Sequence, residues 1–160
     1  MQPTYLPWLG YFDLIARSDI FVFLDDVQFS YRSWQQRNRI LDLGKEKMLT
    51  VPVVRRGNRT NIVDTVIDES QLWREKHFNS IKNAYKKTKH YPYYIRFFEK
   101  NIFKNRDCLN DLNQNLVKSI AFDLGLNKKF LASSELKCSG LKSEKLFNIC
   151  KKLGATQYLS

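Results

Sequence analysis

The chain has 160 residues, of which 43% are hydrophobic, 14% aromatic and 27% charged, with six glycines and four prolines. This composition is typical of one globular domain and excludes a collagen-like or disordered chain. No uncharged apolar run approaches the roughly 20 residues of a membrane-spanning helix, and no basic and apolar leader opens the chain, so we expect a cytoplasmic protein.

The net charge of +11 is unevenly distributed. Residues 1–80 carry 11 Lys and Arg against 10 Asp and Glu, whereas residues 81–160 carry 16 against 6. Lysines scattered along helices are usually solvated, and we favour that interpretation. Binding of nucleic acid, or of another anionic partner such as a lipid surface, through this half is the alternative.

The cysteines and histidines are not spaced as metal ligands. Cys108, Cys138 and Cys150 are odd in number, far apart and never in a Cys-x-x-Cys pair, which argues against a disulfide framework or a thiolate site. His77 and His90 are not at ligand spacing from another histidine or cysteine. We therefore expect no metal site, and the sequence indicates no particular cofactor.

The chain opens with a predicted loop, a short helix and a buried strand. Met1–Pro7 contains two prolines and is typical of a loop, and a helix is predicted over about Tyr11–Ala16. Ile20–Leu24 is aromatic and β-branched, as in a strand buried on both faces. Asp25 and Asp26 follow its carboxyl end, where ligands gather in open α/β sheets.

A β-hairpin is predicted next. Arg39–Leu43 and Met48–Val54 flank Gly44, which can adopt a positive φ, and Pro52 indicates an edge strand or a bulge. Arg55–Arg59 lacks the Gly-Lys-Ser/Thr ending of a P-loop, so it is predicted as a basic turn or a weak phosphate contact.

Three helices are then predicted. From Gln71 onward the apolar residues recur at the three- and four-residue spacing of a helix. Asp68–Ser70, just before this segment, have side chains suited to capping its first turn. Pro92 starts a second helix, and a stripe of leucines predicts a third that ends at Gly125. Together they form a helical insertion at about 70–125.

Three more short strands are predicted, over Ile62–Ile67, Phe130–Ser134 and Thr156–Leu159. A helix between the last two would begin at a Ser143 cap and end at Gly154. The sequence therefore predicts a single α/β domain with a mixed or parallel sheet, flanking helices, a β-hairpin and the helical insertion. The opening loop and the final strand make this domain look truncated at both ends.

The first forty residues are also the predicted site, because rings interleaved with polar groups suit a pocket better than a core. Asp25 and Asp26 are the candidate catalytic residues, as acid, base or hydroxyl-orienting group, with a turn or helix cap as the alternative. On a strand they would point to opposite faces, so only one should face the ligand directly. The predicted ligand-binding residues are Gln2, Tyr5, Trp8, Tyr11, Gln28, Trp34, Arg37, Asn38 and Arg39.

Arg37 and Arg39 alternate on a predicted strand and so share one face. Guanidiniums bind phosphate or carboxylate bidentately, which suits a nucleotide-sugar diphosphate, with surface ion pairs as the alternative. Aromatic rings lie more often in the core than at a site, so we expect only some of Tyr5, Trp8, Tyr11 and Trp34 to contact the ligand. His77 is predicted to be a core histidine. We expect the acidic pair, the arginines and the proline-rich opening to face one cavity.

Several segments together resemble the signature of the bacterial WbqC-like proteins, over essentially the whole chain. They are Gln2-Pro3, Tyr5–Phe12, Asp19, Phe21-Val22, Leu24–Phe29, Trp34, Arg37–Ile40, Thr50–Val53, Trp73, Ala84–Lys87 and Ile149–Tyr158. That family is found among genes for O-antigen and other surface polysaccharides. The resemblance implies modification of a nucleotide-linked amino sugar, by acyl or aminoacyl transfer.

Three functions stay open on the sequence. The first is a transferase of polysaccharide biosynthesis that acts on an activated sugar. The second is a non-catalytic module that binds a nucleotide or a glycan. The third is nucleic-acid binding through the lysine-rich half. No oligomeric state is indicated.

Overall fold

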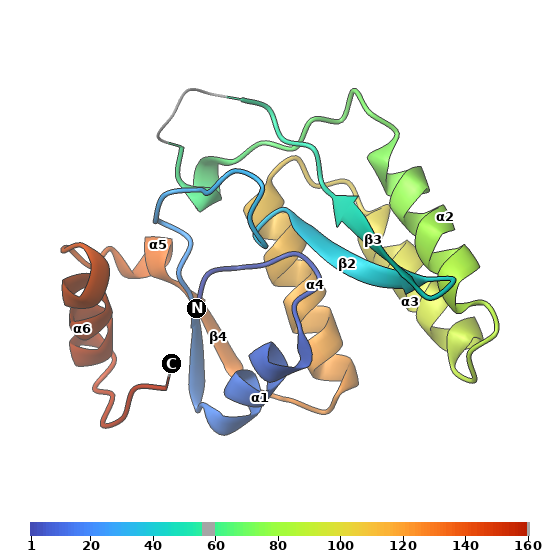
Figure 1. Ribbon diagram of the computed structural model, residues 1–160. Helices are drawn as coiled ribbons and strands as arrows, with labels where there is room; N and C mark the ends of the chain where they lie inside the picture. Colours follow the sequence, from blue (N-terminus) through green and yellow to red (C-terminus); the bar gives the residue numbers. More distant parts are fainter. Residues whose placement is uncertain (56–59, 160) are drawn as a thin grey trace.

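The computed structural model describes residues 1–55 and 60–159, which form both helices and strands (Figure 1). In chain order the elements are α1 (Leu9–Arg17), β1 (Ile20–Phe23), β2 (Arg37–Asp42), β3 (Lys45–Thr50), the 3-10 turn η1 (Ile62–Asp64), α2 (Trp73–Tyr85), α3 (Tyr91–Ile102), α4 (Leu109–Asp123), β4 (Lys129–Ala132), α5 (Ser133–Leu136) and α6 (Lys142–Lys152). This mixture of helices with parallel and antiparallel strands confirms the predicted α/β class.

The strands of the described residues form two separate pairs. β1 and β4 are parallel, with Phe21 opposite Phe130 and Phe23 opposite Ala132. β2 and β3 are antiparallel and are joined at Gly44, whose φ of 77° is the left-handed conformation that glycine accepts without strain. The predicted hairpin is therefore confirmed, although its second strand runs over Lys45–Thr50 rather than Met48–Val54.

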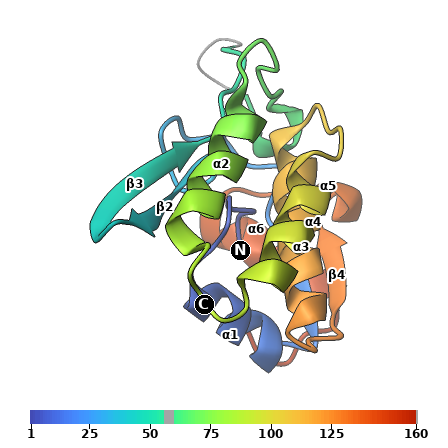
Figure 2. The ribbon, with the colours of Figure 1, turned by 90° about the vertical axis from the view of Figure 1, so that its right-hand side faces the viewer.

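Helix α4 lies between the two parts of the core. One cluster joins the hairpin, α2, α3 and the first half of α4: Tyr5, Ile40, Leu49, Val51, Val53, Ile67, Trp73, Phe98, Ile102, Leu109, Leu112 and Leu116. The other joins α1, β1 and the second half of α4: Tyr11, Phe12, Ile15, Phe21, Phe23, Val117 and Ala121. Figure 2 shows α2 beside the hairpin and α3 beside α4. Both clusters contain residues of α4 and therefore pack against this helix.

The predicted helices are confirmed, with small changes at their ends. Pro92 lies in the first turn of α3, where its missing N–H costs no hydrogen bond. Helix α4 ends just before Gly125, which has a φ of 75°. Helix α6 begins at Lys142, so its N-cap residue is Leu141 and not the predicted Ser143, and no side chain caps the helix.

Three strand predictions were wrong at particular residues. Ile62–Ile67 forms η1 and isolated bridges, because its first N–H groups donate to loop carbonyls at Asp25 and Val27 rather than to a neighbouring strand. Ser133 and Ser134 leave β4 and begin α5. No strand forms over Thr156–Leu159 in the described part of the chain. Of the predicted basic turn Arg55–Arg59, all but Arg55 lies outside the described residues.

Three further observations concern the described residues only. None of their helices combines the length and the apolar character needed to cross a bilayer. Within residues 1–55 and 60–159, no group of three or more His, Cys, Asp or Glu side chains gathers where it could hold a metal ion. All three cysteines are unpaired.

His77 makes the stability of the fold depend on pH. Its ring is 5% exposed, and Nδ1 lies 2.9 Å from the Tyr5 hydroxyl. Burial lowers the pKa of His77 from 6.5 to about 4, against a smaller opposing effect of the Thr50 carbonyl. As the pH falls below 6.5, His77 is therefore protonated in the unfolded chain but stays neutral in the folded chain. We expect lowering the pH from 7.5 to 5 to cost about 2 kcal/mol of unfolding free energy through this group.

Urea unfolding at the two pH values measures this loss. His77→Gln is expected to be less stable at pH 7.5 and to lose about half of the pH dependence, because burial also lowers the pKa of the Met1 amino group, from 8.0 to about 6. His90→Gln is the matched control, because His90 is exposed and lies just before α3, and it should keep the full dependence. An unchanged dependence in His77→Gln would assign the effect to other groups.

Candidate functional site

Asp25 is buried in a network of hydrogen-bond donors where β1 and β4 both end. Its side chain is 1% exposed, and one oxygen accepts from the Ser134 N–H at 2.9 Å. The other oxygen accepts from the Ser134 hydroxyl at 2.9 Å and from the Asn110 amide at 3.2 Å. Gln114 extends the network, since its amide lies 3.0 Å from the Asn110 oxygen. A buried carboxylate this well satisfied holds α4, α5 and β1 in place.

Asp26 forms an ion pair with Lys145 of α6. The Lys145 Nζ lies 2.6 Å from Asp26 Oδ2, and the two side chains are 11% and 20% exposed. The same Nζ lies 3.4 Å from the Cys138 carbonyl oxygen. The Ser133 hydroxyl lies within hydrogen-bond distance of both Asp25 and Asp26, so its single proton can be donated to either.

The two acids point to opposite faces, as strand geometry predicts. From Phe21 to Asp26 burial alternates, so that Phe21, Phe23 and Asp25 are buried while Val22, Leu24 and Asp26 are half-buried. Asp25 therefore continues the core face of β1, and Asp26 continues the face of Val22 and Leu24. Of the pair, Asp26 is the carboxylate that a ligand can reach.

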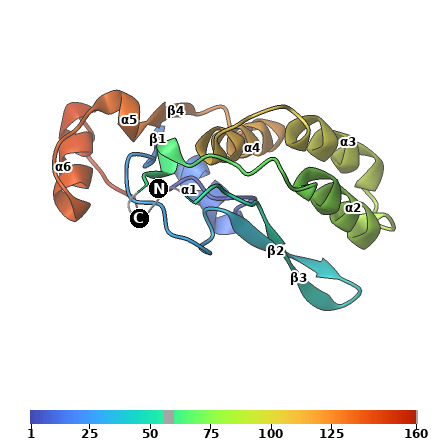
Figure 3. The same ribbon diagram turned by 90° about the horizontal axis from the view of Figure 1, so that it is seen from above.

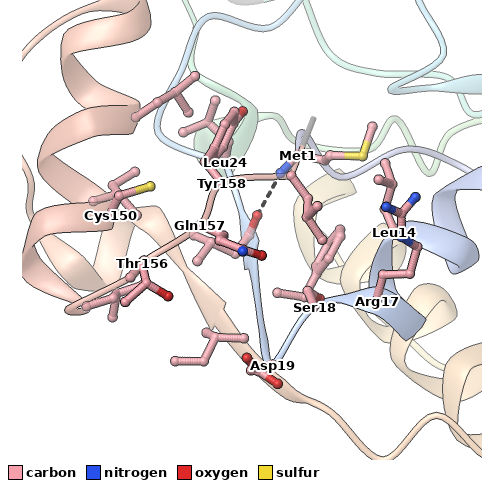
Figure 4. Close-up of a pocket in the computed structure, with 18 of the residues that line it drawn as sticks. Met1, Leu14, Arg17, Ser18, Asp19, Leu24, Cys150, Thr156, Gln157 and Tyr158 are labelled. Atoms are coloured by element: carbon pink, nitrogen blue, oxygen red, sulfur yellow. Dashed lines mark hydrogen bonds between the residues drawn. The ribbon is translucent and has the colours of Figure 1, made fainter.

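A cavity of about 340 Å³ lies along the face of β1 that carries Val22 and Leu24 (Figure 4). Leu146 and Ile149 of α6 form the opposite wall, together with the chain that follows this helix. Asp26 itself is not in the lining, but Leu24 is two residues before it and Leu146 is next to Lys145. The ion pair therefore joins the same two elements, β1 and α6, that enclose the cavity.

The proline-rich opening is fixed to α4 but contributes few accessible groups. Asn113 is fully buried and donates to the Gln35 carbonyl at 2.7 Å and to the Pro3 carbonyl at 3.4 Å. The Gln35 amide in turn donates to the side-chain oxygen of exposed Gln2 at 2.9 Å. The candidates Tyr5 and Tyr11 are 0% and 1% exposed, so their rings fill the core and present no face to a ligand.

The remaining aromatic and amide candidates are at the surface. Trp8 is 68% exposed and packs over Gly10, where a Cβ would meet the indole at 1.9 Å, so a larger residue at this position would have to displace the exposed ring. Trp34 is 48% exposed. Gln28 is exposed and forms an isolated bridge with Asn61.

The arginine candidates lie on the hairpin, apart from the acidic pair. The Arg39 guanidinium is 2.7 Å from Glu46 and 5.0 Å from the centre of the Trp34 ring. Asn38 donates to the carbonyls of Tyr5 and Leu6, and Arg37 is half-buried on the same strand. Seen from above, the hairpin extends away from α5 and α6 (Figure 3). The structure thus brings Asp25 and Asp26 together with Lys145 but not with Arg39.

Five residues of this site were not predicted, namely Asn110, Gln114, Ser133, Ser134 and Lys145. The serines carried a usable signal, because they lie at the carboxyl end of the predicted strand Phe130–Ser134, as the acids lie at the carboxyl end of the first. Asn110 and Gln114 are four residues apart on an otherwise leucine-rich helix, which puts both on one face. Lys145 carried no signal among the many lysines of this half.

Most of those lysines are exposed. The exposed ones are Lys82, Lys86, Lys87, Lys89, Lys100, Lys104, Lys118, Lys129, Lys137, Lys142, Lys151 and Lys152. They are spread over α2, α3, α4, β4, α6 and the connecting loops. This distribution is that of solvated helix surfaces.

Comparison with known proteins gives a family match over nearly all of the chain. The model of a family described as "WbqC-like protein family" matches residues 2–160. The chain is also similar to a protein of Mycobacterium tuberculosis (strain ATCC 25618 / H37Rv) named "Uncharacterized protein Rv1507c", with 32% identity over 169 aligned residues. That alignment covers 100% of this chain and 70% of the relative. No solved structure gives a significant match.

Proposed function

The chain belongs to the WbqC-like protein family, and on that premise we propose that it is a transferase of bacterial surface-polysaccharide (O-antigen) biosynthesis. Its substrate would be a nucleotide-linked amino sugar, and the group transferred an acyl or aminoacyl group. The proposed location is the cytoplasm, where unpaired cysteines stay reduced.

The observation that carries this proposal is the Asp26–Lys145 pair at the junction of β1 and α6. A carboxylate that is 20% exposed can accept a proton from a bound amine, whereas the buried Asp25 is already saturated with donors. The cavity enclosed by the same two elements carries Val22, Leu146 and Ile149 beside polar residues, and this apolar part of its lining is suited to an acyl group.

In the proposed reaction the sugar amine attacks the carbonyl carbon of an activated donor such as a thioester or an ester. A C–N bond forms and the bond to the leaving group breaks. The amine proton passes to Asp26 and then to the leaving group, so no redox partner is needed. Lys145 has a third N–H beyond those directed at Asp26 and Cys138, and it can donate to the developing oxyanion.

Mass spectrometry of reaction mixtures tests the proposal. The purified protein is incubated with UDP- and dTDP-linked amino sugars, each with acyl-CoA thioesters or aminoacyl-tRNAs as donors. The expected result is a nucleotide sugar heavier by one acyl or aminoacyl group. Calorimetric binding of a nucleotide sugar without turnover, with every donor, would instead support the non-catalytic binding module. Steeply salt-dependent RNA binding alone would support the third function.

A further inference from the structure

A second cavity, of about 610 Å³, lies apart from the acidic pair. Three segments of the chain form its walls. The first wall carries Tyr31, Arg32 and Gln36, and the third carries Asp68 and Gln71. The second wall, from the end of β3 onward, carries Thr50 and Pro52–Arg55. The segments that leave β3 and lead into α2 run across the top of the molecule in Figure 1. The volume is within the range of pockets that bind small molecules.

Backbone hydrogen bonds hold the three walls together. The Val51 N–H donates to the Gln36 carbonyl at 2.8 Å, which ties the first wall to the second. The Asp68 N–H donates to the Pro52 carbonyl at 2.9 Å, which ties the second to the third. The cavity is therefore formed before any ligand arrives, which lowers the entropic cost of binding.

Arg32 is held in an uncommon conformation at this cavity. Its φ is 58°, a left-handed value that costs a residue with a side chain some free energy. Gln36, which is 2% exposed, stabilises that conformation, because its side-chain oxygen accepts the Arg32 N–H at 3.2 Å. The buried amide thus fixes the backbone from which the exposed Arg32 side chain projects.

Arg55 is positioned from the second wall by an aromatic ring. Its guanidinium carbon lies 4.8 Å from the centre of the Tyr31 ring, and Phe29 packs edge-on against the same ring. Of the ion pairs among the described residues, none uses Arg32 or Arg55, in contrast to Arg39 and its partner Glu46. Two positive charges therefore flank the cavity without a carboxylate bound to either.

We propose that this cavity binds the diphosphate group of a small ligand, with Arg32 and Arg55 as the two guanidinium donors. Planar guanidiniums match phosphate oxygens bidentately, and two of them on separate walls suit two phosphates. Asp68, on the third wall, is oriented by Ser70 and Gln71 and can accept from a ligand hydroxyl. This binding does not depend on the acyl transfer proposed above.

Titration calorimetry with UDP, inorganic pyrophosphate and uridine tests the site. UDP and pyrophosphate are expected to bind and uridine is not. Arg32→Gln and Arg55→Gln should each raise the dissociation constant about tenfold, because each removes one charge-assisted contact. Arg96→Gln, on the exposed side of α3, removes the same charge elsewhere and should change the affinity by about twofold or less. Thermal melting of each variant checks the fold.

The variants also separate this site from the hairpin. If Arg39→Gln weakens diphosphate binding while Arg32→Gln and Arg55→Gln do not, the anion site lies on β2 and the inference is overturned. Absence of saturable binding by both UDP and pyrophosphate overturns it too. Tighter binding of UDP identifies a nucleotide as the source of the diphosphate, and tighter binding of pyrophosphate identifies the free anion. No turnover is measured, so the result is independent of the transferase assay.

Discussion

Replacing Asp26 with asparagine is expected to lower kcat by about three orders of magnitude on the substrate identified by the transferase assay. Asparagine has nearly the same shape, its oxygen can still accept from Lys145, and its NH₂ group can donate to the Ser133 hydroxyl oxygen, so substrate binding should change little. It cannot accept a proton at neutral pH, so the amine would have to lose its proton to water. The loss should therefore fall on kcat rather than on KM.

Asp42→Asn is the matched control for this variant. Asp42 also pairs with a lysine, Lys47 at 3.4 Å, but on the hairpin and with a more exposed partner. The Asp42→Asn substitution breaks an Asp–Lys pair without changing the junction of β1 and α6, so it should leave kcat unchanged. Equal activity of Asp26→Asn and Asp42→Asn, with both folded by circular dichroism, would contradict the role of Asp26 as a base.

The sequence predicted those parts of the fold that depend on local signals. Pro92 and Gly125 each mark a helix end because their φ preferences act within one turn. The apolar run of β1 and the glycine of the hairpin are local in the same sense. Ile62–Ile67 was predicted wrongly because its β-branched composition is also local, whereas its hydrogen-bond partners, the carbonyls of Asp25 and Val27, are about 35 residues away along the chain.

In the candidate site, too, the features that depend on local signals were predictable from the sequence, whereas those that depend on distant residues were not. The end of a buried strand located Asp25 and Asp26, and the alternation rule separated the buried carboxylate from the accessible one. The alternation of Arg37 and Arg39 was read correctly, but their surroundings depend on hairpin register. That register sets Arg39 opposite Met48, which brings Glu46 within reach of its guanidinium. Whether either arginine binds a ligand stays a prediction.

Lys145 illustrates what sequence patterns leave out. It differs from the exposed lysines only in that α6 folds back against the end of β1, so that burial and the Asp26 partner come together. Such a contact spans more than one hundred residues, and no spacing rule relates the two positions. Resemblance predicted the family, which the match over residues 2–160 confirms, whereas the pairing that suggests a reaction came from tertiary structure.

Asp25→Asn is expected to destabilise the fold by about 3 kcal/mol, although it changes one atom. Both oxygens of Asp25 accept from donors, among them the Ser134 N–H and the Asn110 amide, with almost no water nearby. In either orientation an asparagine turns its NH₂ group toward some of these donors. The network must then break or rearrange, and a buried donor is left without a partner.

Thermal and urea unfolding measure this effect, and for a chain of this length the melting temperature should fall by about 6–12 °C. Asp19→Asn is the control, because Asp19 is exposed and lies just before β1, at the other end of the same strand. Its cost should stay within about 0.5 kcal/mol. If the two variants unfold alike, the carboxylate of Asp25 does not hold β1, α4 and α5 together. A large loss for Asp25→Asn with normal kcat below its melting temperature would assign Asp25 to the scaffold and leave Asp26 as the reactive member of the pair.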